Sequence, residues 1–229
     1  MEYTKLGKTE IEVSKVCVGC MSFGKAGTMH DWTLDEAETE NVVKDALSLR
    51  INFFDTANGY SAGTSEEYLG RALKKNIARD KVVIASKVYF NPGRLSAGAI
   101  HREIDGTLKR LGTDYLDLYI IHRFDYETPI EETMEALNDL VKAGKVRALG
   151  ASAMYGYQFY NMQLVAKGIS SPIIGATKAA HLDDAAKALD VKLTPEDISY
   201  LEEPYVPHRI VGAIDHNPAD GVMLLDEKK

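Results

Sequence analysis

Four side chains have the types and spacing that proton-transfer chemistry requires. Asp55 closes the apolar segment INFFD, Tyr60 follows it by five residues, Lys87 closes VVIASK, and His122 closes YLDLYIIH. Each apolar segment predicts a β-strand, and the C-terminal ends of parallel strands lie together at one rim of a barrel or one edge of a sheet. We therefore expect these four side chains to form one polar cluster.

Lys87 is the most informative of the four. Taken alone, Asp55 is better explained as a helix cap and Tyr60 as a packed ring, and His122 is explained equally well as a core histidine. A lysine that ends a wholly apolar strand is costly to bury unless an opposite charge pairs with it, and Asp55 lies on the neighbouring predicted strand. This pairing favours a functional cluster.

The four groups suit the reduction of a carbonyl group. Hydride delivery to C=O leaves an alkoxide that needs a proton, and a tyrosine supplies it when a lysine stabilises its phenolate form. Tyr60 is therefore the candidate acid, with Lys87 and Asp55 as its partners, and a neutral His122 can orient the carbonyl. Lys87 also permits Schiff-base chemistry in a barrel aldolase, although pairing with Asp55 would keep it protonated.

Alternating strands and helices must position these residues. Strands are predicted at 15–19, 51–55, 82–87, 115–122, 145–152 and 171–177. Helices are predicted at 34–49, 65–75, 96–112, 130–144 and 179–189, with one more ending near Lys167 and another starting at Thr194. A hairpin over 3–13, with its turn at Gly7-Lys8, precedes them. Ser65 is the predicted N-cap of its helix, with Glu66 in the first turn, and Gly112 and Gly144 end two others.

Apolar strands that each precede an amphipathic helix indicate a parallel sheet covered by helices. The segment VGCMSFG after the first strand has glycines only at 19 and 24, so it lacks the G-x-G-x-x-G of an open dinucleotide-binding sheet. We therefore predict an α/β fold, a (β/α)8 TIM barrel with an N-terminal β-hairpin, in a single domain over 1–229.

Only six of the eight βα units that such a barrel needs are found in the sequence. GISSPIIGAT follows the helix ending near Lys167 at once, so two units are missing between 167 and 168. Either the chain lacks them or the sequence joins two pieces across an omitted segment. The second alternative is favoured, because removing two strands exposes sheet edges and opens the core.

Composition and charge exclude several classes of protein. The 229 residues are 45% hydrophobic and 27% charged, as in ordinary globular proteins, and the net charge of −7 argues against a nucleic-acid partner. No apolar run approaches the roughly 20 residues of a membrane span, and MEYTKLGKTE lacks the features of a signal peptide. We expect a cytoplasmic protein, either a monomer or a homo-oligomer.

The two cysteines, Cys17 and Cys20, form a C-x-x-C pair in VCVGC. Such a pair can bind metal or undergo redox chemistry, but a zinc site normally needs a second pair or histidines. Within a strand, an odd separation directs the two side chains to opposite faces. We therefore predict a structural role for both residues and no metal site.

Several motifs resemble those of the aldo-keto reductase family, particularly its bacterial NADPH-dependent members. DTANGY resembles the D-T-A-x-x-Y motif, SEEYLGRALK the segment after it, and IASK the strand with the family lysine. LDLYIIHRFD resembles the strand that ends in the family histidine, KVRALGAS the G-x-S-N strand, and SPIIGATKAAHLDDA the cofactor-phosphate segment. The motifs occur in family order and cover nearly the whole chain.

The resemblance implies an oxidoreductase that reduces small aldehydes or ketones with NADPH bound across the barrel mouth. Tyr60 would be the acid, Lys87 and Asp55 its partners, and His122 would orient the substrate. The nicotinamide ribose would lie beside Gly19, Cys20, Met21 and Asp55, the carboxamide at Ser152, and the adenosine phosphates at Gly175, Thr177, Lys178 and His181. Lys178 would favour NADPH over NADH by pairing with the 2′-phosphate.

Three departures separate the chain from the family pattern. Ala153 replaces an Asn of the carboxamide site, Ala185 replaces an Asn that often contacts adenine, and strands six and seven are missing after Lys167. The loss of nicotinamide contacts leaves open a non-catalytic, nicotinamide-binding regulatory protein. Two explanations are equally open for Trp32, Tyr89, Phe90 and Tyr155: an apolar wall for an aldehyde, or packing in the core or at the surface.

Overall fold

The computed structural model describes residues 1–165 and 194. The chain divides into two compact units, Met1–Gly175 and Ala176–Lys229, and the described residues other than Thr194 belong to the first. Several predicted features lie outside the described residues: the strand 171–177, the helix 179–189, the helix after Thr194 and the junction between 167 and 168. The same holds for Gly175, Thr177, Lys178, His181 and Ala185.

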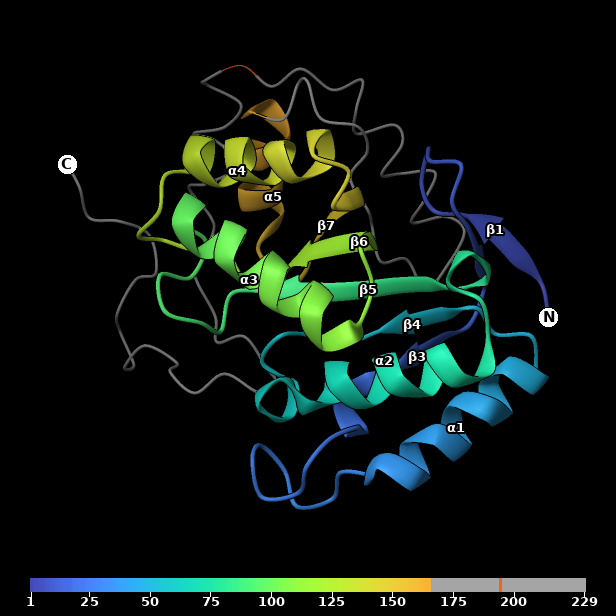
Figure 1. The fold of residues 1–229 in the computed structure, drawn as a ribbon. Helices are drawn as coiled ribbons and strands as arrows, with labels where there is room; N and C mark the ends of the chain where they lie inside the picture. The colour runs from blue at the N-terminus through green and yellow to red at the C-terminus, as the bar shows by residue number, and fades with distance from the viewer. Residues whose placement is uncertain (166–193, 195–229) are drawn as a thin grey trace. The chain divides into compact units, whose positions relative to one another are not determined.

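The described strands and helices follow the predicted order (Figure 1). The hairpin consists of β1 (Tyr3–Lys5) and β2 (Glu12–Ser14), which pair antiparallel. The following strands are β3 (Cys17–Gly19), β4 (Phe53–Asp55), β5 (Val83–Val88), β6 (Leu116–Ile121) and β7 (Val146–Ala151). The helices are α1 (Glu36–Ser48), α2 (Thr64–Asn76), α3 (Ala97–Leu111), α4 (Ile130–Lys142) and α5 (Gly156–Val165), with 3-10 turns η1 (Cys20–Ser22), η2 (Tyr60–Gly63) and η3 (Arg79–Lys81).

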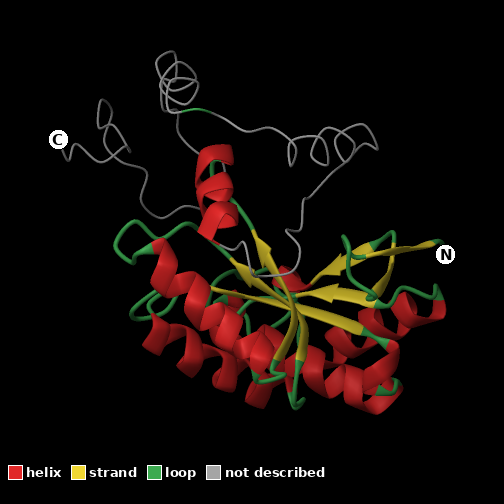
Figure 2. Cartoon of the chain, turned by 90° about the horizontal axis from the view of Figure 1, so that it is seen from above, coloured by secondary structure: helices red, strands yellow, loops and turns green. Residues whose placement is uncertain are grey.

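The five strands β3 to β7 form one parallel sheet in which each strand pairs with the next along the chain. Right-handed connections between such neighbours put the connecting helices on one face, and α1 to α4 lie on one side of the strands (Figure 2). An open doubly wound sheet instead reverses its strand order and carries helices on both faces. The α/β class is confirmed, but no closed barrel is present in the described part of the chain, where the outer edges of β3 and β7 pair with no strand.

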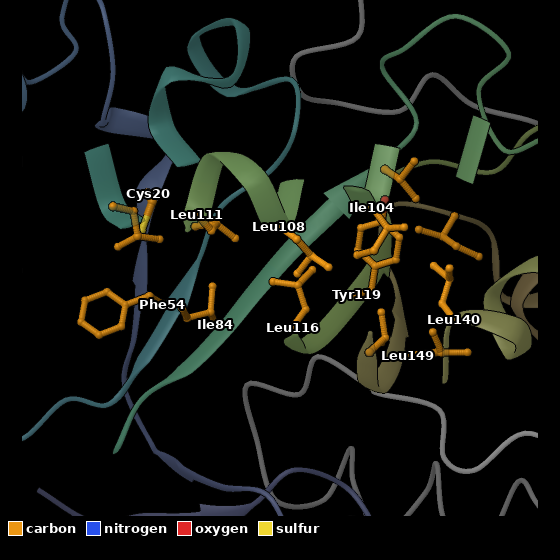
Figure 3. Packing of buried hydrophobic residues seen from close by; sticks show 14 of the residues in the cluster. Cys20, Phe54, Ile84, Ile104, Leu108, Leu111, Leu116, Tyr119, Leu140 and Leu149 are labelled. Carbon is orange, nitrogen blue, oxygen red and sulfur yellow. The ribbon is translucent and has the colours of Figure 1, made fainter. Parts of the chain in front are cut away.

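The larger hydrophobic core lies between this sheet and its helices. Side chains from the strands and from α3 form one buried cluster (Figure 3) that includes Phe54, Ile84, Tyr119, Leu149, Ile104, Leu108 and Leu111. Burying a side chain of this size contributes about 1.5–3 kcal/mol. Helix α2 approaches α3 closely at Gly70, where an added Cβ would lie 2.3 Å from the carbonyl oxygen of Leu111.

The other face of the sheet has a smaller core at the N-terminal ends of its strands. The hairpin packs there against inward-facing strand residues, in a cluster of Leu6, Ile11, Val13, Val83, Ala85, Leu118 and Ala148. Because side chains alternate along a strand, the residues at even spacing from these strand residues share their face. Lys87 lies two residues beyond Ala85, and His122 four residues beyond Leu118. The hairpin therefore fills one end of this face and leaves the other end to polar groups.

The start of α2 differs from its prediction. Ser65 does not cap the helix, which begins at Thr64 after Gly63 in the left-handed conformation (φ 89°). The Ser65 hydroxyl is buried and donates to the carbonyl oxygen of Cys20. Glu66 lies in the first turn, as predicted, where it is fully buried and accepts from Arg110. Both side chains are buried because the first turn of α2 packs against other elements instead of water.

The glycine predictions at the ends of α3 and α4 are confirmed. Gly112 and Gly144 have φ values of 65° and 72°, in the left-handed region that glycine adopts at low cost. Among the described helices, none is both long and apolar enough to cross a membrane.

Candidate active site

The four predicted residues converge at the C-terminal ends of three neighbouring strands. Asp55 is the last residue of β4, Lys87 lies near the end of β5, and His122 directly follows β6. Tyr60 opens the short turn η2, five residues after Asp55. The structure therefore brings together the residues that the sequence predicts to form a cluster.

The Lys87 ammonium group is the centre of this cluster, and its side chain is only 7% exposed. Its Nζ donates to Oδ2 of Asp55 (2.7 Å), to the carbonyl oxygen of Thr56 (2.8 Å) and to the hydroxyl of Tyr60 (3.2 Å). These bonds use all three donors of an ammonium group. Because the Tyr60 oxygen accepts from Lys87, its own proton points elsewhere and is available to another acceptor.

Asp55 has bonding capacity left over. Its Oδ2 accepts from Lys87, whereas its buried Oδ1 has no hydrogen-bond partner among the described residues. Burial raises the pKa of the Asp55 carboxyl group, and the charge of Lys87 partly opposes this shift. A buried oxygen without a partner costs about 1–3 kcal/mol, and a ligand donor at this position would remove that cost.

His122 is held in its neutral form. Burial lowers its pKa to about 3, and the charges of Lys87 and Arg123 act in the same direction. Its ring lies edge-on to Tyr60, with centroids 5.7 Å apart, and edge-on to Phe90, at 4.9 Å. Its Nδ1 is buried without a partner in the described part of the chain. A neutral imidazole next to the phenol can donate its single N–H to a carbonyl oxygen.

The backbone that follows Tyr60 is strained. Ser61 and Ala62 have φ values of 48° and 54°, in the left-handed region that side chains other than glycine adopt at a cost of about 1–3 kcal/mol each. The Ser61 hydroxyl donates to the carbonyl oxygen of Phe23 (3.1 Å) and so helps to hold this conformation. Strain of this kind persists only where the surroundings restrain the backbone.

The residues expected beside the nicotinamide ribose lie in different environments. Gly19 pairs with Asp55 in the sheet, and a Cβ added to it would meet no atom within 4 Å. Met21 is exposed, whereas Cys20 is fully buried in the hydrophobic core.

The predicted carboxamide site lies at the end of β7. Ser152 is partly buried, and its N–H donates to the carbonyl oxygen of Ile121 (2.8 Å), which anchors its backbone to the end of β6. The side-chain hydroxyl takes no part in this bond and can turn toward a ligand. Ala153, which stands where the resembling family has Asn, has φ 46°. Asparagine tolerates this left-handed conformation better than alanine does.

The two cysteines lie in different environments. Both thiols are free, with Cys17 exposed and Cys20 buried, although Cys20 lies in η1 and not in the strand. Burial raises the pKa of the Cys20 thiol, which suppresses its reactive thiolate form. Within the described residues, no group of three His, Cys, Asp or Glu side chains could hold a metal ion.

The aromatic residues expected around a substrate separate into two sets. Phe90 is 45% exposed, contacts His122 and is itself met edge-on by Tyr89. Trp32 instead stacks on His30, and Tyr155 stacks on Tyr157. Of the four, Phe90 has the direct ring contact with the candidate site.

Sequence reasoning missed Asn58, which lies inside the DTANGY motif. Its buried side chain donates to Oδ1 of Asn91 (3.1 Å) and to Oε2 of Glu103 (3.0 Å). The motif indicates a loop next to Asp55, but no local pattern indicates partners 33 and 45 residues away.

Comparison with known proteins adds independent support. The sequence model of the Aldo/keto reductase family matches residues 15–169. Versiconal hemiacetal acetate reductase of Aspergillus parasiticus is 31% identical over 340 aligned positions, which cover 92% of this chain and 98% of the relative. An aldo-keto reductase of Fusarium vanettenii is 40% identical over 195 residues, covering 72% of this chain and 52% of the relative.

Solved structures give the same result. The holo form of an aldo-keto reductase from Bacillus halodurans has a TM-score of 0.64 and 32% sequence identity, covering 75% of this chain and 56% of that chain. The chain therefore spans about half the length of the Bacillus structure and of the Fusarium relative, with shares of 56% and 52%.

Asp55, Tyr60, Lys87 and His122 all lie within the matched range, residues 15–169. The family and its solved members imply a (β/α)8 barrel, and the described residues form a sheet of five consecutive parallel strands. The order of strands and helices, the cluster of four polar side chains and the similarity to known aldo-keto reductases point to the same family. The chain belongs to the aldo/keto reductase family.

Proposed function

We propose that this protein reduces an aldehyde or ketone to an alcohol, with NADPH as the hydride donor and Tyr60 as the general acid. The observation that carries the proposal is the arrangement around Lys87, whose Nζ binds Asp55, the Thr56 carbonyl group and the Tyr60 hydroxyl. This arrangement suits a phenol that gives up its proton, because the adjacent ammonium group stabilises the phenolate left behind.

Each of the four residues has a distinct role in the proposed reaction. Tyr60 donates its proton to the carbonyl oxygen as negative charge develops there, and Lys87 stabilises the resulting phenolate. Asp55 keeps Lys87 charged and aimed at Tyr60. His122, neutral because burial lowers its pKa to about 3, hydrogen-bonds and orients the substrate oxygen.

The residues present fit a nicotinamide cofactor. Oδ1 of Asp55, which has no partner among the described residues, and the open space at Gly19 lie on adjacent strand ends, where a ribose hydroxyl group could donate to the carboxylate. When bound, NADPH supplies the hydride. As the family resemblance implies, Gly19, Cys20 and Met21 would line the ribose, and Ser152 would bind the carboxamide.

The phosphate end of the cofactor site is proposed from the sequence alone. Gly175, Thr177, Lys178 and His181 lie outside the described residues, so their contacts with the phosphates stay predictions. The preference for NADPH over NADH depends on Lys178 and stays a prediction for the same reason.

We also propose that the five strands are the first five of a (β/α)8 barrel whose missing units belong between 167 and 168. The family match ends at residue 169, next to this junction. The match to the Aspergillus relative supports a gap as well, because 92% of a chain of 229 residues occupies only about 211 of the 340 aligned positions.

Two alternatives are less well supported. Schiff-base catalysis needs an uncharged lysine amine, but the Lys87 nitrogen is paired with Asp55 and has its donors occupied. A non-catalytic nicotinamide-binding protein fits the missing family segment, but it gives no reason for a phenol held against a buried lysine. Turnover of NADPH with a simple aldehyde separates this second alternative from the enzyme.

The decisive test is Tyr60→Phe, which removes one oxygen and keeps the ring. General acid catalysis contributes about 10²–10⁴-fold, so single-turnover oxidation of bound NADPH by an aldehyde, followed by absorbance, should slow by at least that range. Packing and cofactor binding should change little, because the aromatic contact with His122 remains.

Tyr115→Phe is the matched control, since this tyrosine stacks with Arg79 far from the cluster. It should reduce the aldehyde at the parental rate. A Tyr60→Phe rate within a few-fold of the parent would exclude Tyr60 as the acid.

A further inference from the structure

Asn58 lies in the loop between Asp55 and Tyr60, and it is only 8% exposed. Its side-chain nitrogen donates to Oδ1 of Asn91 (3.1 Å) and to Oε2 of Glu103 (3.0 Å). Its backbone N–H donates to the carbonyl oxygen of Lys87 (3.2 Å). One residue therefore fastens the loop of the proposed acid to the end of β5, to the loop after it and to α3.

The acceptors of Asn58 are themselves held in place. Oδ1 of Asn91 also accepts from the backbone N–H of Tyr89 (3.2 Å), and Nδ2 of Asn91 donates to the carbonyl oxygen of Arg94 (3.0 Å). Glu103 belongs to α3, and its side chain is 16% exposed. Because both acceptors have fixed orientations, they fix the position of the Asn58 amide group.

The chain is fastened again on the other side of Tyr60. Ser61 donates to the carbonyl oxygen of Phe23 (3.1 Å), and Ser61 and Ala62 are in the left-handed conformation. A backbone in this conformation relaxes when its restraints are removed. Tyr60 thus lies between two anchors, and loss of the Asn58 anchor would let the strained segment shift.

We infer that Asn58 is a positioning residue that holds the Tyr60 hydroxyl against Lys87. The inference rests on the acid role proposed for Tyr60. Asn58 acts through the backbone of its loop and does not bind the Tyr60 or Lys87 side chain among the contacts of the described residues. A displacement of about 1 Å in a reacting group lowers a rate by about a hundredfold, so a positioning residue in this loop has a large effect on turnover.

The test uses Asn58→Asp in the full chain, because this change keeps the shape and removes both donors. The new carboxylate would face the oxygens of Asn91 and Glu103 and be repelled by them. We expect kcat to fall about ten- to a hundredfold, while the Kd of NADPH stays within about twofold of the parent.

A second change provides the rescue. In the double variant Asn58→Asp/Glu103→Gln, the introduced amide group can donate to the introduced carboxylate, so most of kcat should return. Glu103→Gln alone keeps an acceptor oxygen for Asn58 and should stay near the parental kcat. A parental kcat in Asn58→Asp would overturn the inference. The inference would also fail if kcat fell equally in Asn58→Asp and in the double variant and if both variants lost thermal stability to the same extent.

Crystal structures of the two variants provide a readout without turnover. The distance from Lys87 Nζ to the Tyr60 hydroxyl oxygen is 3.2 Å in the parent. It should lengthen in Asn58→Asp and return in the double variant, and an unchanged distance would overturn the inference. If the parent reduces no carbonyl compound, the proposed function fails, but this distance still decides whether Asn58 positions Tyr60.

Discussion

Asp117 near the start of β6 and Asp55 at the end of β4 are both carboxylates paired with cations in the same sheet, but their surroundings differ. Oδ1 of Asp117 accepts from Arg147 (2.7 Å), and its Oδ2 accepts from Arg79 (2.7 Å) and from the backbone N–H of Ile84 (3.0 Å). Asp55 binds Lys87 through one oxygen only, and the other is buried without a partner among the described residues.

The difference separates a structural cluster from a candidate catalytic one. At Asp117 both carboxylate oxygens have partners, so the cluster stabilises the N-terminal end of the sheet and offers nothing to a ligand. At Asp55 and His122, buried atoms lack partners within the described residues, and the ionisation of both groups is shifted by burial. Unsatisfied capacity together with shifted pKa values is typical of functional sites.

The largest expected effect follows from removing the cation of the catalytic cluster. Lys87→Met keeps a chain of similar length and removes the ammonium group that stabilises the Tyr60 phenolate. Single-turnover reduction should slow by about 10²–10⁴-fold, whereas NADPH binding, measured by fluorescence titration, should remain.

Lys74→Met on the exposed side of α2 is the matched control and should behave like the parent. A parental rate in Lys87→Met would show that Lys87 has no part in the mechanism. The clusters around Asp55 and Asp117 would then not differ in function.

The second effect concerns stability at the other cluster. Asp117→Asn keeps the size but removes the charge that faces Arg79 and Arg147, and its NH₂ group would meet one of these donors. Breaking a buried ion pair by changing one partner costs about 3 kcal/mol in the free energy of unfolding, measurable by urea denaturation.

The folded fraction of Asp117→Asn should reduce the carbonyl substrate at the parental rate, because Asp117 lies at the opposite end of the strands. A loss of stability below about 1 kcal/mol, or a slower rate per folded molecule, would contradict the structural assignment.

The smallest effect is on the pH dependence of stability. The folded-state pKa of His122 is about 3, below its usual 6.5, so the unfolded chain takes up the proton first as the pH falls. Folding is therefore destabilised progressively between about pH 6.5 and pH 3, whereas above 6.5 His122 has no such effect. Asp55, whose pKa is raised, contributes a slope of the opposite sign.

Thermal denaturation of His122→Gln tests this sign. Its Tm should fall less than that of the parent when the pH is lowered from about 7 to about 5, because the variant has no imidazole to protonate. Parallel Tm curves for the two proteins would show that His122 is not held neutral by burial.

Local sequence patterns predict much of this fold. The sequence predicts the hairpin, five strands and their helices in order, and the C-terminal ends of three strands lead to Asp55, Lys87 and His122. These predictions succeed because apolar periodicity and helix-ending glycines act over a few neighbouring residues. The prediction of Ser65 as a cap is wrong because a tertiary contact with Cys20 takes its hydroxyl.

What the sequence by itself determined is the alternation of strand and helix and the end of each strand at which its polar residue lies. Only the tertiary structure decided which polar groups have hydrogen-bond partners. Glu66 accepts from Arg110, 44 residues away, and Asn58 donates to Glu103, 45 residues away, whereas Asp55 keeps one oxygen without a partner among the described residues. The physical reason is the distance along the chain over which each property is determined. A side chain's face depends on its immediate neighbours in the chain, whereas its hydrogen bonds depend on where distant elements pack.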